Sequence, residues 1–294
     1  MKILVTGSQG QLGRELMLQA DKAGVRVEGV DLPDFDLTRP DHIKNAAQRY
    51  RPDLLVNAAA YTAVDRAESE ETLCMAVNRD GPRHLAQYCR EAGIPLVHVS
   101  TDFVFDGRKK TPYTESDPPA PLGVYARSKA EGEKAVQDTL DRHLILRTAW
   151  LYSVHGQNFV KTMLRLGAER SEISVVADQY GCPTSAADLA AAILAIAGRL
   201  AAAENEMWGI YHYCGDGVTT WYGFACEIFE QARRHTQLKV TRVMPIATED
   251  YPTDAARPAY SALDCGKIAA RFGIRPPAWQ ESLAATIARL YSAA

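Results

Sequence analysis

Apolar residues in the first 150 positions come in short runs separated by stretches with helical spacing. Short apolar runs bounded by glycine, proline or polar residues are typical of buried strands, and apolar residues three and four apart are typical of helices. The alternation of the two predicts an α/β fold with a doubly wound parallel sheet. The expected strands are 2–6, 25–30, 53–60, 94–100 and 143–152, and the expected helices are 11–20, 41–50, 72–92 (kinked at Gly81-Pro82) and 125–138.

The pattern loosens after Trp150, where Pro and Gly punctuate the connections. No internal repeat or low-complexity linker separates the two halves, so we expect a smaller C-terminal lobe packed against the first domain. The expected division is 1–150 and 151–294, with some later segments returning to the first domain. Helices are expected near 158–168, 185–200, 220–234 and 280–292, and strands within 173–176, 209–214 and 239–246.

Composition narrows the class of protein. Of 294 residues, 47% are hydrophobic and 23% charged, as in soluble globular proteins. A net charge of −3 favours neither nucleic acid nor an anionic membrane as a partner. Neither a signal peptide nor a membrane span is evident, and six scattered cysteines form no CxxC pair. We therefore expect a cytoplasmic protein with reduced thiols and no metal site.

Three glycines follow the first expected strand, in "TGSQGQLG". Gly7, Gly10 and Gly13 lie three apart where the chain passes from a strand into a helix. Glycine permits a tight turn and close backbone approach, and the N–H groups of a helix start attract phosphates. The spacing GxxGxxG differs from the standard GxGxxG, and a glycine-rich turn without a ligand is the alternative. The position nevertheless favours a Rossmann-type dinucleotide site.

Asp31 ends the second expected strand, where a carboxylate would accept hydrogen bonds from the adenosine ribose. Its charge would repel a 2′-phosphate, which favours NADH. An aspartate that merely starts a loop before Pro33 is the alternative. Asp36 and Leu37 are expected to flank the adenine, and the small residues of "NAAAYT" (57–62) would let a cofactor lie close to the sheet edge.

Candidate catalytic groups follow the fourth strand and open the helix after it. Tyr125 and Lys129 lie four apart in "YARSK", and Thr101 ends "VHVST". A phenol is a poor acid at neutral pH, and a nearby ammonium group would lower its pKa. Tyr125 could then protonate a carbonyl oxygen that Thr101 also contacts, while Lys129 holds the nicotinamide ribose. A solvated helix edge is the alternative for the Tyr–Lys pair.

These motifs resemble the extended short-chain dehydrogenase/reductases, and within them the dTDP-4-dehydrorhamnose reductase family. The more specific segments are "DQYGCPT" (178–184) and "ARPAYSALD" (256–264). The resemblance implies NAD(P)H-dependent reduction of a 4-keto nucleotide sugar, dTDP-4-dehydro-L-rhamnose, in the last step of dTDP-L-rhamnose biosynthesis. It implies a catalytic triad of Thr101, Tyr125 and Lys129, a sugar contact at Trp150, and cofactor contacts at Gly10, Gln11, Leu12, Asp31, Asp36, Leu37, Ala60 and Thr62.

The C-terminal lobe is expected to hold the substrate. Arg257 is the candidate for the substrate diphosphate, because guanidinium binds phosphate in a bidentate way. A surface arginine before Pro258 is the alternative. Asn158 is expected to line the same cleft. The "DQYGCPT" segment resembles a substrate loop of the family, and a turn in which Thr184 or Ser185 caps the next helix is compatible with it.

The sequence departs from the family at two points. Some members form a dimer linked by Mg²⁺ through glutamates, where this chain has Ala187 and, one place out of register, Asp188. Mg²⁺ is therefore doubtful, and a monomer or weak homodimer is expected. The family mainly uses NADPH whereas Asp31 favours NADH, so the choice between NADPH and NADH stays open.

Four other functions are alternatives, and the first of them lacks a residue that it needs. A 4,6-dehydratase would need an Asp-Glu pair after the catalytic threonine, and here Asp102 is followed by Phe103. Another sugar-nucleotide reductase, or a 4-epimerase, would use the same Thr, Tyr and Lys. A non-catalytic regulatory subunit, like the beta subunit of methionine adenosyltransferase, resembles the same family.

Overall fold

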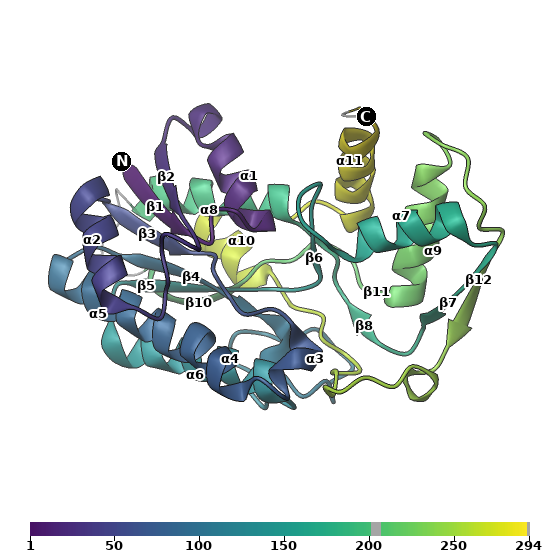
Figure 1. Ribbon diagram of the computed structural model, residues 1–294, viewed down its shortest axis with the longest axis horizontal. Coiled ribbons are helices and arrows are strands. Elements are labelled where there is room, and N and C mark those ends of the chain that lie inside the picture. Colours follow the sequence, from purple (N-terminus) through teal and green to yellow (C-terminus); the bar gives the residue numbers. More distant parts are fainter. Residues whose placement is uncertain (201–206, 293–294) are drawn as a thin grey trace.

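Six parallel strands form the central sheet, as a computed structural model covering residues 1–200 and 207–292 describes (Figure 1). Their order is β10-β5-β4-β3-β1-β2, and each neighbouring pair is parallel. Because the chain turns to opposite sides after β1 and after β2, a crevice opens at the carboxyl ends of the strands. The strands are β1 (Lys2–Thr6), β2 (Arg26–Val30), β3 (Leu54–Asn57), β4 (Leu96–Thr101), β5 (His143–Thr148) and β10 (Gly209–His212).

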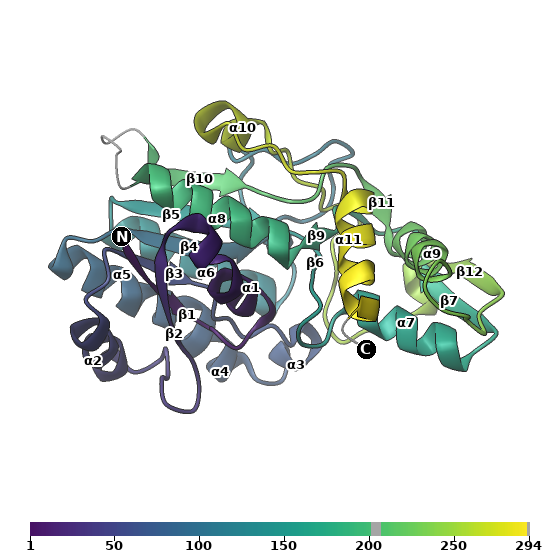
Figure 2. The ribbon, with the colours of Figure 1, turned by 90° about the horizontal axis from the view of Figure 1, so that it is seen from above.

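Helices cover both faces of the sheet (Figure 2). On one face, α1 (Gln11–Gln19), α8 (Ala186–Leu200) and α10 (Gly266–Phe272) pack against β1 and β3. On the other face lie α2 (Pro40–Tyr50), α5 (Gly81–Ala92) and α6 (Val124–Thr139). The predicted Rossmann-type architecture is therefore confirmed. Three of its elements, α8, β10 and α10, come from the second half of the chain. None of the described helices is long and apolar enough to cross a membrane.

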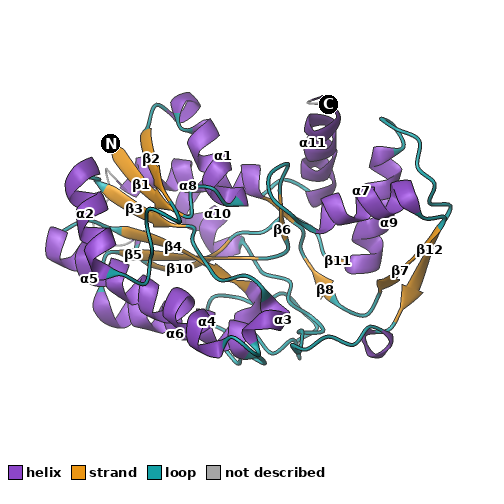
Figure 3. Cartoon of the chain, in the orientation of Figure 1, coloured by secondary structure: helices purple, strands orange, loops and turns teal. Residues whose placement is uncertain are grey.

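A smaller lobe lies beside the sheet domain, at the right of Figure 1. Its helices pack around a separate apolar core that includes Phe224, Phe229 and Leu283. Its strands pair in twos, and Figure 3 shows them as short segments between the helices. The elements are β6 (Leu151–Tyr152), α7 (Phe159–Glu169), β7 (Glu172–Val176), β8 (Tyr180–Gly181), β9 (Thr184–Ser185), β11 (Thr219–Thr220), α9 (Trp221–Ala232), β12 (Arg242–Ile246) and α11 (Trp279–Ser292).

The helix expected over 72–92 is divided. After α3 (Val64–Ala67) come α4 (Glu71–Met75), a π-helical turn (Ala76–Asp80) and then α5. Pro82 has no N–H to give, and its ring would clash with the carbonyl group of Asn78 in a regular helix. The wider turn accommodates the proline and turns Asn78 into the interior. Single 3₁₀ turns lie at Asp21–Ala23, Asp102–Val104 and Thr248–Asp250.

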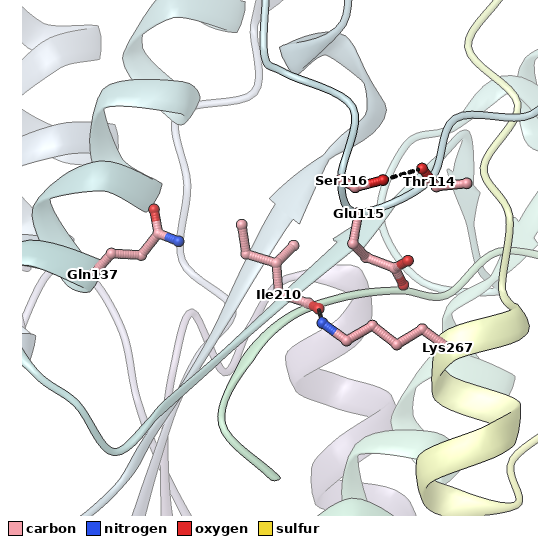
Figure 4. Close-up of a pocket in the computed structure, with 6 residues that line it drawn as sticks. All are labelled: Thr114, Glu115, Ser116, Gln137, Ile210 and Lys267. Atoms are coloured by element: carbon pink, nitrogen blue, oxygen red, sulfur yellow. Dashed lines mark hydrogen bonds between the residues drawn. The ribbon is translucent and has the colours of Figure 1, made fainter. Parts of the chain in front are cut away.

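The outer edge of the sheet at β10 is closed by side chains. The His212 N–H donates to the Glu115 carboxylate at 2.9 Å, and the Lys267 Nζ donates to the Ile210 carbonyl at 2.6 Å. Figure 4 shows Glu115, Ile210 and Lys267 around a surface cavity of about 530 Å³, which Thr114, Ser116 and Gln137 also line. Glu115 and Lys267, the charged residues that line this cavity, bind backbone groups of the edge strand β10. We therefore interpret the cavity as part of the covering that protects this edge of the sheet.

A buried ion pair fixes α6 on the sheet. Glu133 of α6 accepts two hydrogen bonds from Arg147 of β5, at 2.9 and 2.6 Å, and the side chains are 3% and 1% exposed. Arg147 also lies over the ring of Phe105, 5.0 Å from its centroid. Burial, and then the charge of Arg147, lower the pKa of His212 to about 3, so that His212 stays neutral.

Breaking this pair should destabilise the protein strongly. We expect Arg147→Met to lower the free energy of unfolding by about 3–5 kcal/mol, because Glu133 would remain as an uncompensated buried charge. Urea denaturation followed by circular dichroism measures the change. As a control, Asp138→Asn removes the exposed Lys134–Asp138 pair (side chains 74% and 61% exposed) and should cost no more than about 0.5 kcal/mol. Equal effects of the two substitutions would contradict the assignment.

Candidate active site

The glycine loop between β1 and α1 has the geometry of a phosphate cradle. Gly7 has a φ of 73°, which disfavours any residue with a side chain, and a Cβ there would lie 2.6 Å from the Ala59 nitrogen. A Cβ on Gly13 would lie 2.1 Å from the Gly7 carbonyl oxygen. Gly10 is the N-cap of α1 and provides no side-chain cap. The helix therefore presents N–H groups of Gln11 and Leu12 that an anion would satisfy.

Asp31 joins the end of β2 to this loop. One of its carboxylate oxygens accepts the Gln9 N–H at 2.8 Å, and the other accepts the Leu32 N–H at 2.8 Å. The carboxylate thus lies beside the glycine loop, as expected. Asp36 accepts the Thr38 N–H and hydroxyl, and the Leu37 side chain is buried against Gly81.

The loop after β3 is held by a buried amide that the sequence analysis did not single out. The Asn78 side chain accepts the Tyr61 N–H at 2.9 Å and donates to the Tyr61 carbonyl at 3.0 Å. It also donates to the Ser128 hydroxyl at 3.0 Å. Asn78 therefore ties the segment containing Ala60 and Thr62 to α6. A polar residue just before Gly81-Pro82 was the only signal of this role.

Thr101, Tyr125 and Lys129 meet at the carboxyl end of β4. Thr101 is the last residue of that strand, and Tyr125 and Lys129 lie in the first turns of α6. The Tyr125 ring packs edge-on against Phe103, 5.8 Å away. The buried Lys129 donates to the Val99 carbonyl at 2.7 Å. The Thr101 hydroxyl thus lies next to the Tyr125 phenol, with Lys129 one helical turn further along α6, at the same edge of the sheet as the glycine loop.

The expectation that Lys129 lowers the pKa of Tyr125 is wrong for this structure. Burial raises the pKa of Tyr125, and the opposing influence is the neighbouring hydroxyl of Thr101. Burial lowers the pKa of Lys129 to about 8, against the charge of Glu133, which raises it. The difference arises because the Lys129 ammonium is directed at a backbone carbonyl, while the partly buried phenol loses solvent contact.

Trp150 has an unusual backbone conformation where the two lobes meet. Its φ is 45°, rare for a bulky residue and characteristic of functional sites. Its indole stacks on Trp221, with ring centroids 3.5 Å apart and planes within 6°. A Cβ on Gly181, in the "DQYGCPT" segment, would lie 2.4 Å from this indole. The segment is therefore shaped around Trp150. Ser185, just after it, accepts the Ala187 N–H and caps α8.

Asn158 lies against the start of α1, next to the glycine loop. Its amide donates to the Gln11 side chain at 2.9 Å and to the Ser153 carbonyl at 2.7 Å, and its oxygen caps α7 by accepting the Lys161 N–H at 3.1 Å. Asn158 therefore connects the smaller lobe to the start of α1.

Arg257 spans from the smaller lobe to α3. Its guanidinium group donates to the Asp65 carboxylate at 2.8 Å, and the side chain is 24% exposed. The other Asp65 oxygen accepts the Ala255 N–H at 3.2 Å. Asp65 lies just after Thr62, so Arg257 is close to the expected cofactor segment. The pairing with Asp65 was not anticipated from the sequence.

No group of three His, Cys, Asp or Glu residues within residues 1–200 and 207–292 is arranged to hold a metal ion. Asp188, the acid near the family's metal position, accepts a hydrogen bond from Ser282 of α11. All six cysteines are free.

Comparison with known proteins agrees with this geometry. The fold is shared with UDP-glucose 4-epimerase from Thermus thermophilus in complex with NAD, at a TM-score of 0.81, 23% identity and full coverage of both chains. The chain therefore has the Rossmann-type α/β fold of that enzyme.

The family follows from closer matches. The family model described as RmlD substrate binding domain matches residues 1–292. A dTDP-4-dehydrorhamnose reductase from Sinorhizobium fredii is 46% identical, over 96% of this chain and 95% of its own. The crystal structure of dTDP-4-dehydrorhamnose reductase from Bacillus anthracis in complex with NADP has a TM-score of 0.91 and 37% identity, and covers 98% of this chain and 99% of its own. The chain belongs to the dTDP-4-dehydrorhamnose reductase family.

Lys129 should titrate well below the usual range of a lysine side chain. In protein labelled with ¹³C-lysine, we expect one Cε signal to report a pKa of about 8 and to vanish in Lys129→Met. Because burial depresses this pKa in the folded state, the unfolded chain binds more protons between about pH 8 and pH 10, and this group's contribution to stability rises with pH in that window. The Cε signal of Lys134, whose side chain is 74% exposed, provides the control for a lysine in contact with solvent. A Lys129 signal that titrates in the usual range of a lysine would contradict the burial argument.

Proposed function

We propose that the protein reduces the 4-keto group of dTDP-4-dehydro-L-rhamnose to give dTDP-L-rhamnose, with NAD(P)H as reductant. The observation that carries this proposal is the meeting of Thr101, Tyr125 and Lys129 at the end of β4, beside a glycine loop with an uncapped helix start. Membership of the reductase family supports the nature of the substrate.

The residues of the chain divide the work of the reaction. The bound reduced nicotinamide supplies a hydride to the C4 carbon. Tyr125 donates its proton to the keto oxygen, so that negative charge does not build up there. Thr101 donates a hydrogen bond to the same oxygen and orients it. Lys129 supplies positive charge one helical turn from Tyr125 and is placed to bind the nicotinamide ribose.

The cofactor site accepts a dinucleotide on the evidence of its glycines. Gly7 and Gly13 allow the loop to fold tightly against backbone atoms that any side chain would strike, and Gly10 leaves the start of α1 free for a pyrophosphate. We propose that both NADH and NADPH bind. The charge of Asp31 disfavours a 2′-phosphate, whereas a relative with 37% identity is known in complex with NADP.

The function is tested by following the oxidation of NADPH and of NADH with dTDP-4-dehydro-L-rhamnose. We expect turnover by the wild type and a loss of at least about 100-fold in kcat for Tyr125→Phe, because the proton donor is removed. Phe103→Leu, which changes the ring packed on Tyr125, is the matched control and should retain most activity. Cofactor binding should survive in both variants.

Other results would favour other functions. A wild type that binds cofactor but interconverts the C4 configuration of a nucleotide sugar, with no net oxidation, would favour a 4-epimerase. Binding of cofactor without turnover of any nucleotide sugar would favour a regulatory subunit.

Arg257 is proposed to bind the substrate diphosphate, in exchange for Asp65. A carboxylate oxygen already accepts a hydrogen bond from one of its guanidinium nitrogens, and a diphosphate would offer bidentate geometry with more charge. Arg257→Ala should raise KM on the order of tenfold or more with little change in kcat, as steady-state kinetics would show. Arg108→Ala, which removes an exposed arginine (87% exposed), is the control. An unchanged KM for Arg257→Ala would reject the role.

A further inference from the structure

Asp102 is a buried acid next to Thr101 that the mechanism above leaves without a role. It is 2% exposed. One carboxyl oxygen, Oδ1, accepts a hydrogen bond from the Thr101 hydroxyl at 3.0 Å. The other, Oδ2, is buried and has no hydrogen-bond partner among the residues that the structure describes. Burying a carboxylate that has an unsatisfied oxygen costs free energy, so the presence of Asp102 at this position needs a functional explanation.

The surroundings of Asp102 are largely uncharged. The Phe103 N–H donates to Thr101 at 3.2 Å, which holds the threonine from the backbone side. Ser261 is close enough to lower the pKa of Asp102, without reaching hydrogen-bond geometry at Oδ2. Tyr125 of α6 is the titratable group that faces it, and the negative charge of an ionised Asp102 raises the pKa of that phenol.

The single hydrogen of the Thr101 hydroxyl can go to only one acceptor at a time. If Asp102 is ionised, its Oδ1 holds this hydrogen, and Thr101 offers only lone pairs to a ligand. If Asp102 is a neutral acid, it donates to Thr101, and the threonine hydrogen is left for the keto oxygen. A neutral Asp102 also removes the charge that makes Tyr125 a weaker acid.

We propose that Asp102 is a positioning residue that works as a neutral acid, donating to Thr101 so that the threonine hydroxyl donates to the substrate oxygen. The inference rests on the proposed reductase function. Burial raises the pKa of Asp102 to about 6, which brings the neutral form within reach of neutral pH. An anionic substrate that displaces solvent raises it further, since both effects disfavour a carboxylate.

The kinetic test compares Asp102→Asn with Asp102→Ala, each in the wild type and in Thr101→Val. The amide of asparagine can donate to Thr101 as the neutral acid does, so Asp102→Asn should keep most of the activity that Asp102→Ala loses. We expect Asp102→Ala to lower kcat on the order of tenfold or more with little change in KM. In Thr101→Val, Asp102→Ala should lower kcat by less than about twofold, because Asp102 acts only through that hydroxyl.

Two kinetic results would overturn the proposal. One is an equal loss in Asp102→Asn and Asp102→Ala. The other is a loss from Asp102→Ala that multiplies on top of Thr101→Val, as a merely structural role would give. Circular dichroism and NADPH binding check that each variant is folded.

Infrared difference spectroscopy tests the protonation state without any turnover. Spectra of wild type against Asp102→Asn, each saturated with NADPH and dTDP at pH 7, should show the carbonyl band of one neutral carboxyl group in the wild type. Its absence would reject the neutral acid. A wild type that gives this band but does not reduce the keto sugar would refute the proposed function while leaving the assignment of Asp102 as a neutral acid intact.

Discussion

The position of α6 on the sheet decides whether this protein has an active site at all. Tyr125 and Lys129 are one turn apart on that helix, and Glu133 follows one turn later. Glu133 is bound to Arg147 of β5 in an ion pair closed to solvent, which fixes the helix along its axis. Gly132 fixes its distance from the neighbouring turn, because a Cβ there would lie 2.1 Å from the Asn78 carbonyl oxygen. A shift of α6 by one turn would move both reactive groups away from Thr101.

Charged residues on and beside α6 influence one another's protonation. Arg147 holds the Glu133 carboxylate, whose negative charge supports protonation of Lys129 against the effect of burial. Interactions between neighbouring charged groups, such as these, are strong in a protein interior because little solvent screens them. The ion pair that anchors the helix therefore also affects the pKa of Lys129, the ammonium group proposed to act beside Tyr125.

A feature could be predicted from the sequence when it depends on residues that lie close together in the chain. The glycine spacing, the strand–helix alternation and the Tyr–Lys pair are set by residues close together in the chain, and the structure shows the strands and helices that they predict. The tie between Asn158 and Gln11 joins positions 147 residues apart, and the pairing of Arg257 with Asp65 joins positions 192 apart. Such contacts depend on how the smaller lobe docks, which no local pattern encodes. The pKa of Tyr125 was misjudged for the same reason, because burial is a property of the assembled fold.

The smaller lobe packs against the sheet domain. This packing would create the site for a second ligand beside the proposed nucleotide site. Asn158 reaches Gln11 at the start of α1, and Arg289 of α11 binds the buried Glu15 of the same helix at 3.0 Å. Trp150, which stacks on Trp221, lies where the chain passes from the sheet domain into the smaller lobe. Contacts from the smaller lobe thus converge on α1, the helix that begins at the glycine loop. If a dinucleotide binds at that helix start as proposed, its binding and the packing of the lobe would stabilise each other, because both would restrain α1.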